Sequence, residues 1–137
     1  MASRTVSGVV SVLAAGVLLA APAAAQSDTF TTDDRGFVGT EARCEEPTVA
    51  YAFGRTQRSL VAICTLDGGY EYRGVRLRDD ALLTAAATKT DDGEFVAENG
   101  GVSYTFSAKE LVIGAGQRVI RTEPMVAYVE PRLAAEG

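Results

Sequence analysis

Residues 58–78, which read RSLVAICTLDGGYEYRGVRLR, decide the fold. Apolar side chains occupy both parities between residues 60 and 64, so an extended strand here would be apolar on both of its faces. A strand of this kind lies in the interior of a sheet. The Asp-Gly-Gly at 67–69 is a strong signal for a tight turn, and alternation resumes after it. The stretch therefore predicts a central antiparallel β-hairpin.

The second half of this hairpin contains an irregularity at Gly74. Simple alternation would place Arg76 and Arg78 on the same face as Tyr70 and Tyr72. A glycine inside a strand often marks a β-bulge, which shifts the alternation by one residue. We predict such a bulge at Gly74. The bulge would place Val75 and Leu77 on the same face as the two tyrosines. Four charged residues would then lie on the solvent side: Glu71, Arg73, Arg76 and Arg78.

The rest of the chain continues the same pattern on both sides of this hairpin. Short runs rich in Val, Tyr, Phe, Ile and Thr alternate with turn residues from residue 36 to residue 130, beginning with a candidate strand at 37–44. Residues 82–90 fit a strand or a short helix, and their threonines favour the strand. We predict an all-β domain, a single small antiparallel sandwich or partly closed barrel of about eight or nine strands.

The first 25 residues have the order of a secretory signal peptide. One cation, Arg4, precedes an apolar run over residues 6–19, and small residues end at Ala25. We expect cleavage between Ala25 and Gln26. The alternative is a retained membrane anchor, but the run of about 14 residues is shorter than the roughly 20 that a spanning helix needs. The sequence thus predicts a secreted, extracytoplasmic protein without a stable membrane span. We expect residues 26–35 to be a flexible leader and 131–137 a loose tail.

Two cysteines, Cys44 and Cys64, follow the predicted signal peptide. In an oxidising compartment such a pair usually forms a disulfide. The closed loop of about 20 residues would stabilise the fold by roughly 3 kcal/mol in the chain-entropy model. The alternatives are a redox pair, which lacks the Cys-x-x-Cys spacing, and a metal site, which would have two thiolates and no histidine. We predict a structural disulfide.

Composition excludes several classes of function. The net charge is −5, and loss of Arg4 with the signal peptide makes it about −6, so nucleic acid is not the expected partner. The chain has no His, which removes the commonest general base and the usual zinc ligand set, and no Trp. We expect no metal, no cofactor and no enzymatic activity. The alternative is a carboxylate-based hydrolase, which needs two carboxylates that face each other. The acidic pairs in this chain are neighbours in sequence, and a strand would point the two side chains of each pair to opposite faces. These pairs are Asp33-Asp34, Glu45-Glu46, Asp79-Asp80 and Asp91-Asp92.

Arginines supply the best candidate for a binding surface. Arg73, Arg76 and Arg78 would form a cationic stripe, and Arg55 and Arg58 flank a turn that can lie beside it. Such a stripe would hold phosphate, sulfate or carboxylate groups. The alternative is a solvated face whose arginines pair with nearby acids. Two aromatic residues, Tyr70 and Tyr72, belong either to the core or to an exposed binding platform.

Three segments also carry a resemblance. They are GFV at 36–38 with ARC at 42–44, GRT at 54–56 with SLVAIC at 59–64, and YEYRGVRL at 70–77. Together they resemble uncharacterised small exported proteins of mycolate-bearing actinobacteria, and the extracellular tails of some receptor-type serine/threonine kinases. The resemblance implies an extracytoplasmic sensing or binding module and transfers no site residue. We therefore expect a secreted, non-catalytic binding module of the cell envelope, whose partner is an envelope polymer or a protein. The alternative is a secreted inhibitor or effector of a partner enzyme.

Overall fold

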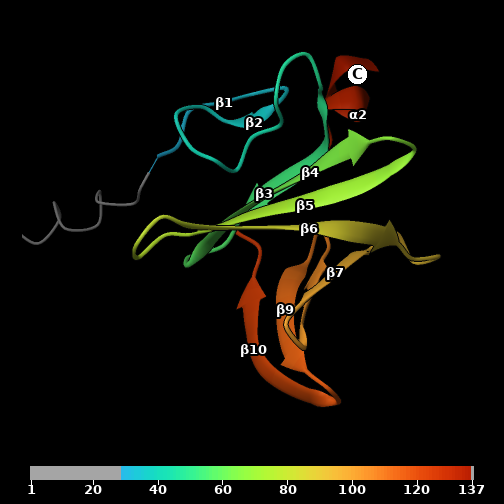
Figure 1. The fold of residues 1–137 in the computed structure, drawn as a ribbon. Helices are drawn as coiled ribbons and strands as arrows, with labels where there is room; N and C mark the ends of the chain where they lie inside the picture. The colour runs from blue at the N-terminus through green and yellow to red at the C-terminus, as the bar shows by residue number, and fades with distance from the viewer. Residues whose placement is uncertain (1–28, 137) are drawn as a thin grey trace, which may run out of the picture.

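The computed structural model describes residues 29–136, and almost all of its regular structure is β (Figure 1). Nine antiparallel strands form one curled sheet in the order β10-β9-β8-β7-β6-β5-β4-β3-β11, and β1 and β2 form a separate pair. The all-β prediction is confirmed, and the partly closed barrel describes the sheet better than a sandwich. The predicted signal peptide lies outside the described residues. The elements are β1 (Thr32–Asp33), β2 (Gly36–Phe37), β3 (Ala50–Arg55), β4 (Ser59–Leu66), β5 (Gly69–Arg76), β6 (Ala81–Lys89), β7 (Phe95–Asn99), β8 (Val102–Phe106), β9 (Glu110–Ala115), β10 (Arg118–Pro124), β11 (Ala127–Val129) and α2 (Pro131–Glu136).

The predicted central hairpin is the pair β4–β5. Its strands pair without interruption from Ser59 opposite Arg76 to Leu66 opposite Gly69. The turn places Asp67 at φ 47° and Gly68 at φ 84°, the left-handed region that this short connection needs. Strand β4 is buried on both faces, as its sequence predicts. The strand predicted for residues 82–90 is confirmed by β6.

The predicted bulge at Gly74 is wrong. Gly74 pairs with Val61 on one side and with Leu83 on the other, and neither ladder shifts there. The glycine instead makes room for an aromatic ring, since a Cβ at Gly74 would lie 2.7 Å from Cε1 of Tyr72. Strict alternation therefore continues through the strand. It places Tyr72 and Arg76 on the concave face of the sheet, and it turns Arg73 to the convex face.

The sheet curls until its two edge strands nearly meet. Strand β10 is one edge and β11 the other, and only Met125 and Val126 connect them. The connection is close-packed against β3, because a Cβ at Gly54 would lie 2.9 Å from Sδ of Met125. The backbone N–H of Val126 donates to the carbonyl oxygen of Arg55 at 2.8 Å. These contacts hold the sheet as a half-barrel.

The concave face of the half-barrel holds the larger hydrophobic core. Tyr51, Tyr70 and Phe95 meet there edge to face, with ring centroids 5.0 to 5.3 Å apart. Arg132 of α2 covers this corner, with its guanidinium carbon 3.9 Å from the centre of the Tyr51 ring. The loose tail expected from residue 131 is thus a short helix in the structure. The buried members of this core are Ala52, Val61, Ile63, Tyr72, Ala87, Phe95, Ala97, Phe106, Leu111 and Ile113.

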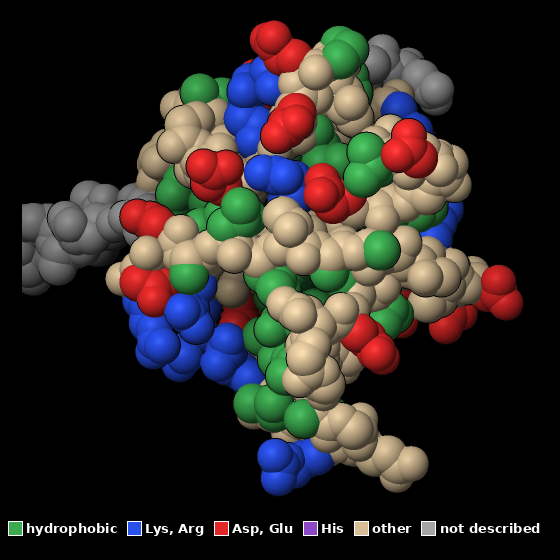
Figure 2. All heavy atoms as spheres, viewed as in Figure 1, with side chains coloured by type: hydrophobic (Ala, Val, Ile, Leu, Met, Phe, Trp, Pro, Cys, Tyr) green, Lys and Arg blue, Asp and Glu red, His purple; other side chains and the backbone are tan. Residues whose placement is uncertain are grey.

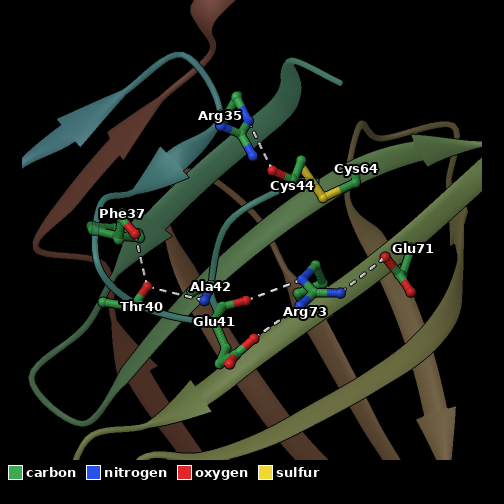
Figure 3. A network of polar contacts seen from close by, with 9 residues as sticks. All are labelled: Arg35, Phe37, Thr40, Glu41, Ala42, Cys44, Cys64, Glu71 and Arg73. Atoms are coloured by element: carbon green, nitrogen blue, oxygen red, sulfur yellow. Dashed lines mark hydrogen bonds and ion pairs between the residues drawn. A yellow bond between two sulfur atoms is a disulfide. The ribbon is translucent and has the colours of Figure 1, made fainter. Parts of the chain in front are cut away.

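A cover formed by residues 30–49 packs on the convex face, above β3, β4 and β5 (Figure 1). Phe37 and Cys44 of the cover are buried against this part of the sheet. The disulfide between Cys44 and Cys64 is confirmed and joins the cover to β4 (Figure 3). The strand expected at 37–44 is confined to β2, after which the chain turns back. Part of the expected flexible leader forms β1 and pairs with β2.

Candidate anion-binding site

The structure removes Arg73 from the predicted arginine stripe. Arg73 is 9% exposed and points into the space between the sheet and the cover (Figure 3). Its Nε donates to the backbone carbonyl oxygen of Glu41 at 3.0 Å, and its other nitrogens lie 3.5 Å from the carboxylates of Glu41 and Glu71. A buried guanidinium with all of these partners holds the cover in place. Arg73 is therefore a structural residue.

Two other predicted site residues also lie apart from the stripe. Arg55 stacks over the ring of Phe30, with 5.3 Å between the guanidinium carbon and the ring centre. Tyr70 belongs to the aromatic corner of the concave core. Tyr72 is part of the same core, but its ring also lines a pocket that is described below.

Three predicted residues, Arg58, Arg76 and Arg78, come together with a fourth that the sequence did not indicate. Arg121 of β10 reaches the same place because the curl of the sheet brings β10 across to the turn between β3 and β4. Figure 2 shows the cationic side chains gathered just below the turn that joins β5 and β6. We call this place the arginine hollow. It has a volume of about 340 Å³ and is lined by Gln57, Arg58, Arg76, Leu77, Arg78 and Arg121.

The four guanidinium groups are not equally neutralised. Arg76 forms a two-pronged salt bridge with Asp79, both distances being 2.9 Å, and this hydrogen bonding lowers the pKa of Asp79. The side chains of Arg58 and Arg78 form no hydrogen bond or salt bridge with any residue that the structure describes, and both residues are exposed. Guanidinium groups with free donors bind phosphate, sulfate and carboxylate with two parallel hydrogen bonds. The hollow can therefore accept an anionic group.

An apolar pocket adjoins the arginine hollow. It exists because β6 pairs with β7 only from Ala87 onward, so the first half of β6 has no neighbour on that side. The gap has a volume of about 290 Å³ and opens toward β8, β9 and β10. Arg76 and Arg121 line both the pocket and the hollow, so the two spaces adjoin each other. The pocket is otherwise lined mainly by Tyr72, Leu83, Tyr104, Leu111 and Ile113.

Tyr72 contributes a buried phenol ring and its hydroxyl to the lining of this apolar pocket. The residue is 2% exposed, and its ring centre lies 5.6 Å from that of Tyr104. Burial, together with the nearby Tyr104 and Glu123, raises the pKa of Tyr72 above its ordinary value, so the side chain stays a neutral hydroxyl. In the described part of the chain this hydroxyl has no hydrogen-bond partner. It is free to donate to an oxygen of a bound molecule.

Glu123 sets the position of Arg121 at the boundary between the two spaces. It is 3% exposed and is the one buried carboxylate among residues 29–133, for which side-chain burial is described. It accepts hydrogen bonds from Oγ1 of Thr56 at 2.6 Å, from Oγ of Ser59 at 2.9 Å and from Nε of Arg121 at 2.7 Å. The carboxylate thereby ties β10 to the turn between β3 and β4, and it fixes the side of the arginine hollow that β10 supplies.

The pKa of Glu123 makes this tie dependent on pH. Desolvation by burial raises the pKa, but the three hydrogen bonds together outweigh it, and the pKa lies below the ordinary 4.5. A carboxylate with a lowered pKa stabilises the fold above the pKa of the unfolded chain, and the stabilisation is lost as pH falls through the folded pKa. We expect Glu123→Gln to reduce the free energy of unfolding by about 1–3 kcal/mol at pH 7. The deficit should shrink below about pH 4.5.

Urea unfolding of both proteins between pH 3 and pH 7 measures this difference. The exposed Glu98→Gln is the matched control, and it should keep the pH dependence of the parent protein. A Glu123→Gln deficit that is the same at pH 3 and pH 7 would contradict the expectation.

Two further features of the described residues concern metal binding and membrane-spanning helices. No group of three or more His, Cys, Asp or Glu side chains within the described part of the chain is placed to hold a metal ion. None of the helices in residues 29–136 is long and apolar enough to cross a membrane. No family model, curated protein or solved structure matches the chain. A function for this chain therefore has to be inferred from the geometry of the site.

Proposed function

We propose that this chain is an exported, non-catalytic binding module that takes an anionic group of its ligand in the arginine hollow. The observation that carries the proposal is the convergence of four arginines from separate strands and turns, two of them without a salt bridge to any described residue. The whole chain has a net charge of −5, so a local cluster of cations stands out against its surroundings.

Export is supported by the disulfide and by the N-terminal sequence. A disulfide such as Cys44–Cys64 is typical of oxidising, extracytoplasmic compartments. Residues 1–25 have the pattern of a signal peptide. In the cell envelope, the partner would be an envelope component or a protein that presents a phosphate, sulfate or carboxylate group. The resemblance to exported actinobacterial proteins agrees with this setting.

Titration of the purified protein with inorganic phosphate and pyrophosphate, followed by calorimetry or NMR, tests the proposal. We expect saturable binding, and we expect Arg58→Glu with Arg78→Glu to weaken it at least tenfold. The side chains of both arginines form no hydrogen bond with a described residue and are exposed, so the variant should fold normally, which circular dichroism checks. A tenfold change corresponds to about 1.4 kcal/mol, which two charge reversals at an anion site should exceed.

The matched control is Lys109→Glu with Arg118→Glu. Both residues are exposed and lie outside the arginine hollow, and the pair changes the net charge by the same amount. We expect this control to bind as the parent protein does. The proposal fails if the parent protein shows no saturable binding at millimolar phosphate or pyrophosphate. It fails also if the control loses as much affinity as the arginine variant.

A further inference from the structure

We infer that the ligand is a small amphiphilic anion, whose acidic head occupies the arginine hollow and whose apolar body enters the adjoining apolar pocket. This inference rests on the proposed function and specifies the class of ligand. It is carried by the adjacency of two spaces of opposite character, one cationic and one apolar, which share Arg76 and Arg121.

The two spaces share their boundary residues. Arg76 comes from the end of β5 and Arg121 from β10, and each lines both the hollow and the pocket. Their guanidinium groups are each held by an acid, Asp79 and Glu123 respectively, which fixes their positions. A head group between these arginines and the free Arg58 and Arg78 would therefore be next to the entrance of the apolar pocket.

The interior of the apolar pocket suits an uncharged body. Leu83, Tyr104, Leu111 and Ile113 provide its walls, and no charged residue other than the two boundary arginines lines it. Gly74 leaves room for the ring of Tyr72, which lines the pocket, because a Cβ at Gly74 would lie 2.7 Å from Cε1 of that ring. Removal of apolar ligand surface from water is the driving force that such walls supply.

The size of the pocket favours a compact ligand. Small-molecule sites usually measure roughly 300–1,000 Å³, and the apolar pocket lies at the lower limit of this range with about 290 Å³. One alkyl chain or a similar slender body would fill it. The Tyr72 hydroxyl would then face the ligand, and a ligand oxygen near the head group can accept its hydrogen bond.

Calorimetric titration with three probes tests this inference: decyl phosphate below its micellar concentration, inorganic phosphate, and decyl maltoside as a neutral amphiphile. Decyl phosphate is then titrated again at raised salt. We expect decyl phosphate to bind at least tenfold more tightly than either inorganic phosphate or decyl maltoside. We also expect its affinity to fall as the salt concentration rises, because the head group pairs with exposed arginines.

Two variants separate the head from the body. Leu83→Gln in the apolar pocket should weaken decyl phosphate at least tenfold and leave inorganic phosphate unchanged. Leu66→Gln, an exposed leucine at the end of β4, is the matched control and should change neither affinity. Arg58→Glu with Arg78→Glu should weaken both phosphates.

The outcomes that would overturn the inference differ from those that would overturn the proposed function. If decyl phosphate binds no more tightly than inorganic phosphate, or if Leu83→Gln leaves its affinity unchanged, the amphiphile inference fails while an anion site remains. If decyl maltoside binds as tightly as decyl phosphate, the inference fails because the head group contributes nothing. If neither phosphate binds, both the inference and the proposed function fail.

Discussion

Phe95→Ala is expected to lower the free energy of unfolding by about 3–5 kcal/mol, the range for loss of a fully buried phenylalanine. Phe95 is 1% exposed and packs edge to face against Tyr51 and Tyr70. It also begins β7, whose ladder with β6 has only three pairs. This short ladder joins the two halves of the half-barrel, so the aromatic packing around Phe95 carries much of the connection between them.

Urea unfolding followed by far-ultraviolet circular dichroism measures this loss. Phe95→Leu should cost less than the alanine variant, because most of the buried volume is retained. Val119→Ala removes an exposed side chain from β10 and should change stability by no more than about 0.5 kcal/mol. A loss below about 1 kcal/mol for Phe95→Ala would show that the two halves of the sheet are held together elsewhere.

Replacement of both cysteines, Cys44→Ala with Cys64→Ala, should lower the free energy of unfolding by about 3 kcal/mol. The bond closes a loop with a sequence separation of 20, and the chain-entropy model assigns roughly this stabilisation to such a loop. Both cysteines are buried in the convex core, where the small alanines also lose packing contacts. The disulfide is the covalent link between the cover and the sheet, so the cover should open more readily in the variant.

Unfolding in the presence and absence of a reductant tests this directly. The reductant should destabilise the parent protein by about the same 3 kcal/mol and leave the double variant unchanged. Limited proteolysis should then cut the cover, within residues 38–48, faster in the double variant than in the parent protein. Identical unfolding curves for the oxidised and reduced parent protein would contradict the prediction.

Local sequence signals predicted a large part of the fold. The hairpin β4–β5 follows from an apolar run, a turn of Asp and Gly, and a second alternating run, all within residues 58–78. The strand character of β6 and the pairing of the two cysteines were also predicted correctly. These features depend on neighbouring residues or on the small number of cysteines. The helix α2 was not predicted, and its Arg132 contacts Tyr51, which is 81 positions earlier in the chain.

The candidate site was predicted only in part. The prediction that Arg73, Arg76 and Arg78 share one face depended on a bulge at Gly74. The structure has no bulge, so Arg73 faces the cover while Arg76 faces the concave side. Arg121 was missed altogether. Its one local signal is the pairing with Glu123 two residues later, which lies on the same face of a strand.

The sequence by itself determined an all-β chain with a central hairpin, a structural disulfide and a signal-like N-terminus, because periodicity, turn residues and cysteine number are local or compositional properties. The tertiary structure alone decided which arginines meet. The ring of Tyr72 lies over Gly74 in a strand whose alternation is unbroken, and the curl of the sheet carries Arg121 of β10 to Arg58 and Arg76. The first is a contact between near neighbours whose geometry the folded sheet fixes, and the second depends on packing between residues that are distant in the chain. Neither is encoded in local patterns.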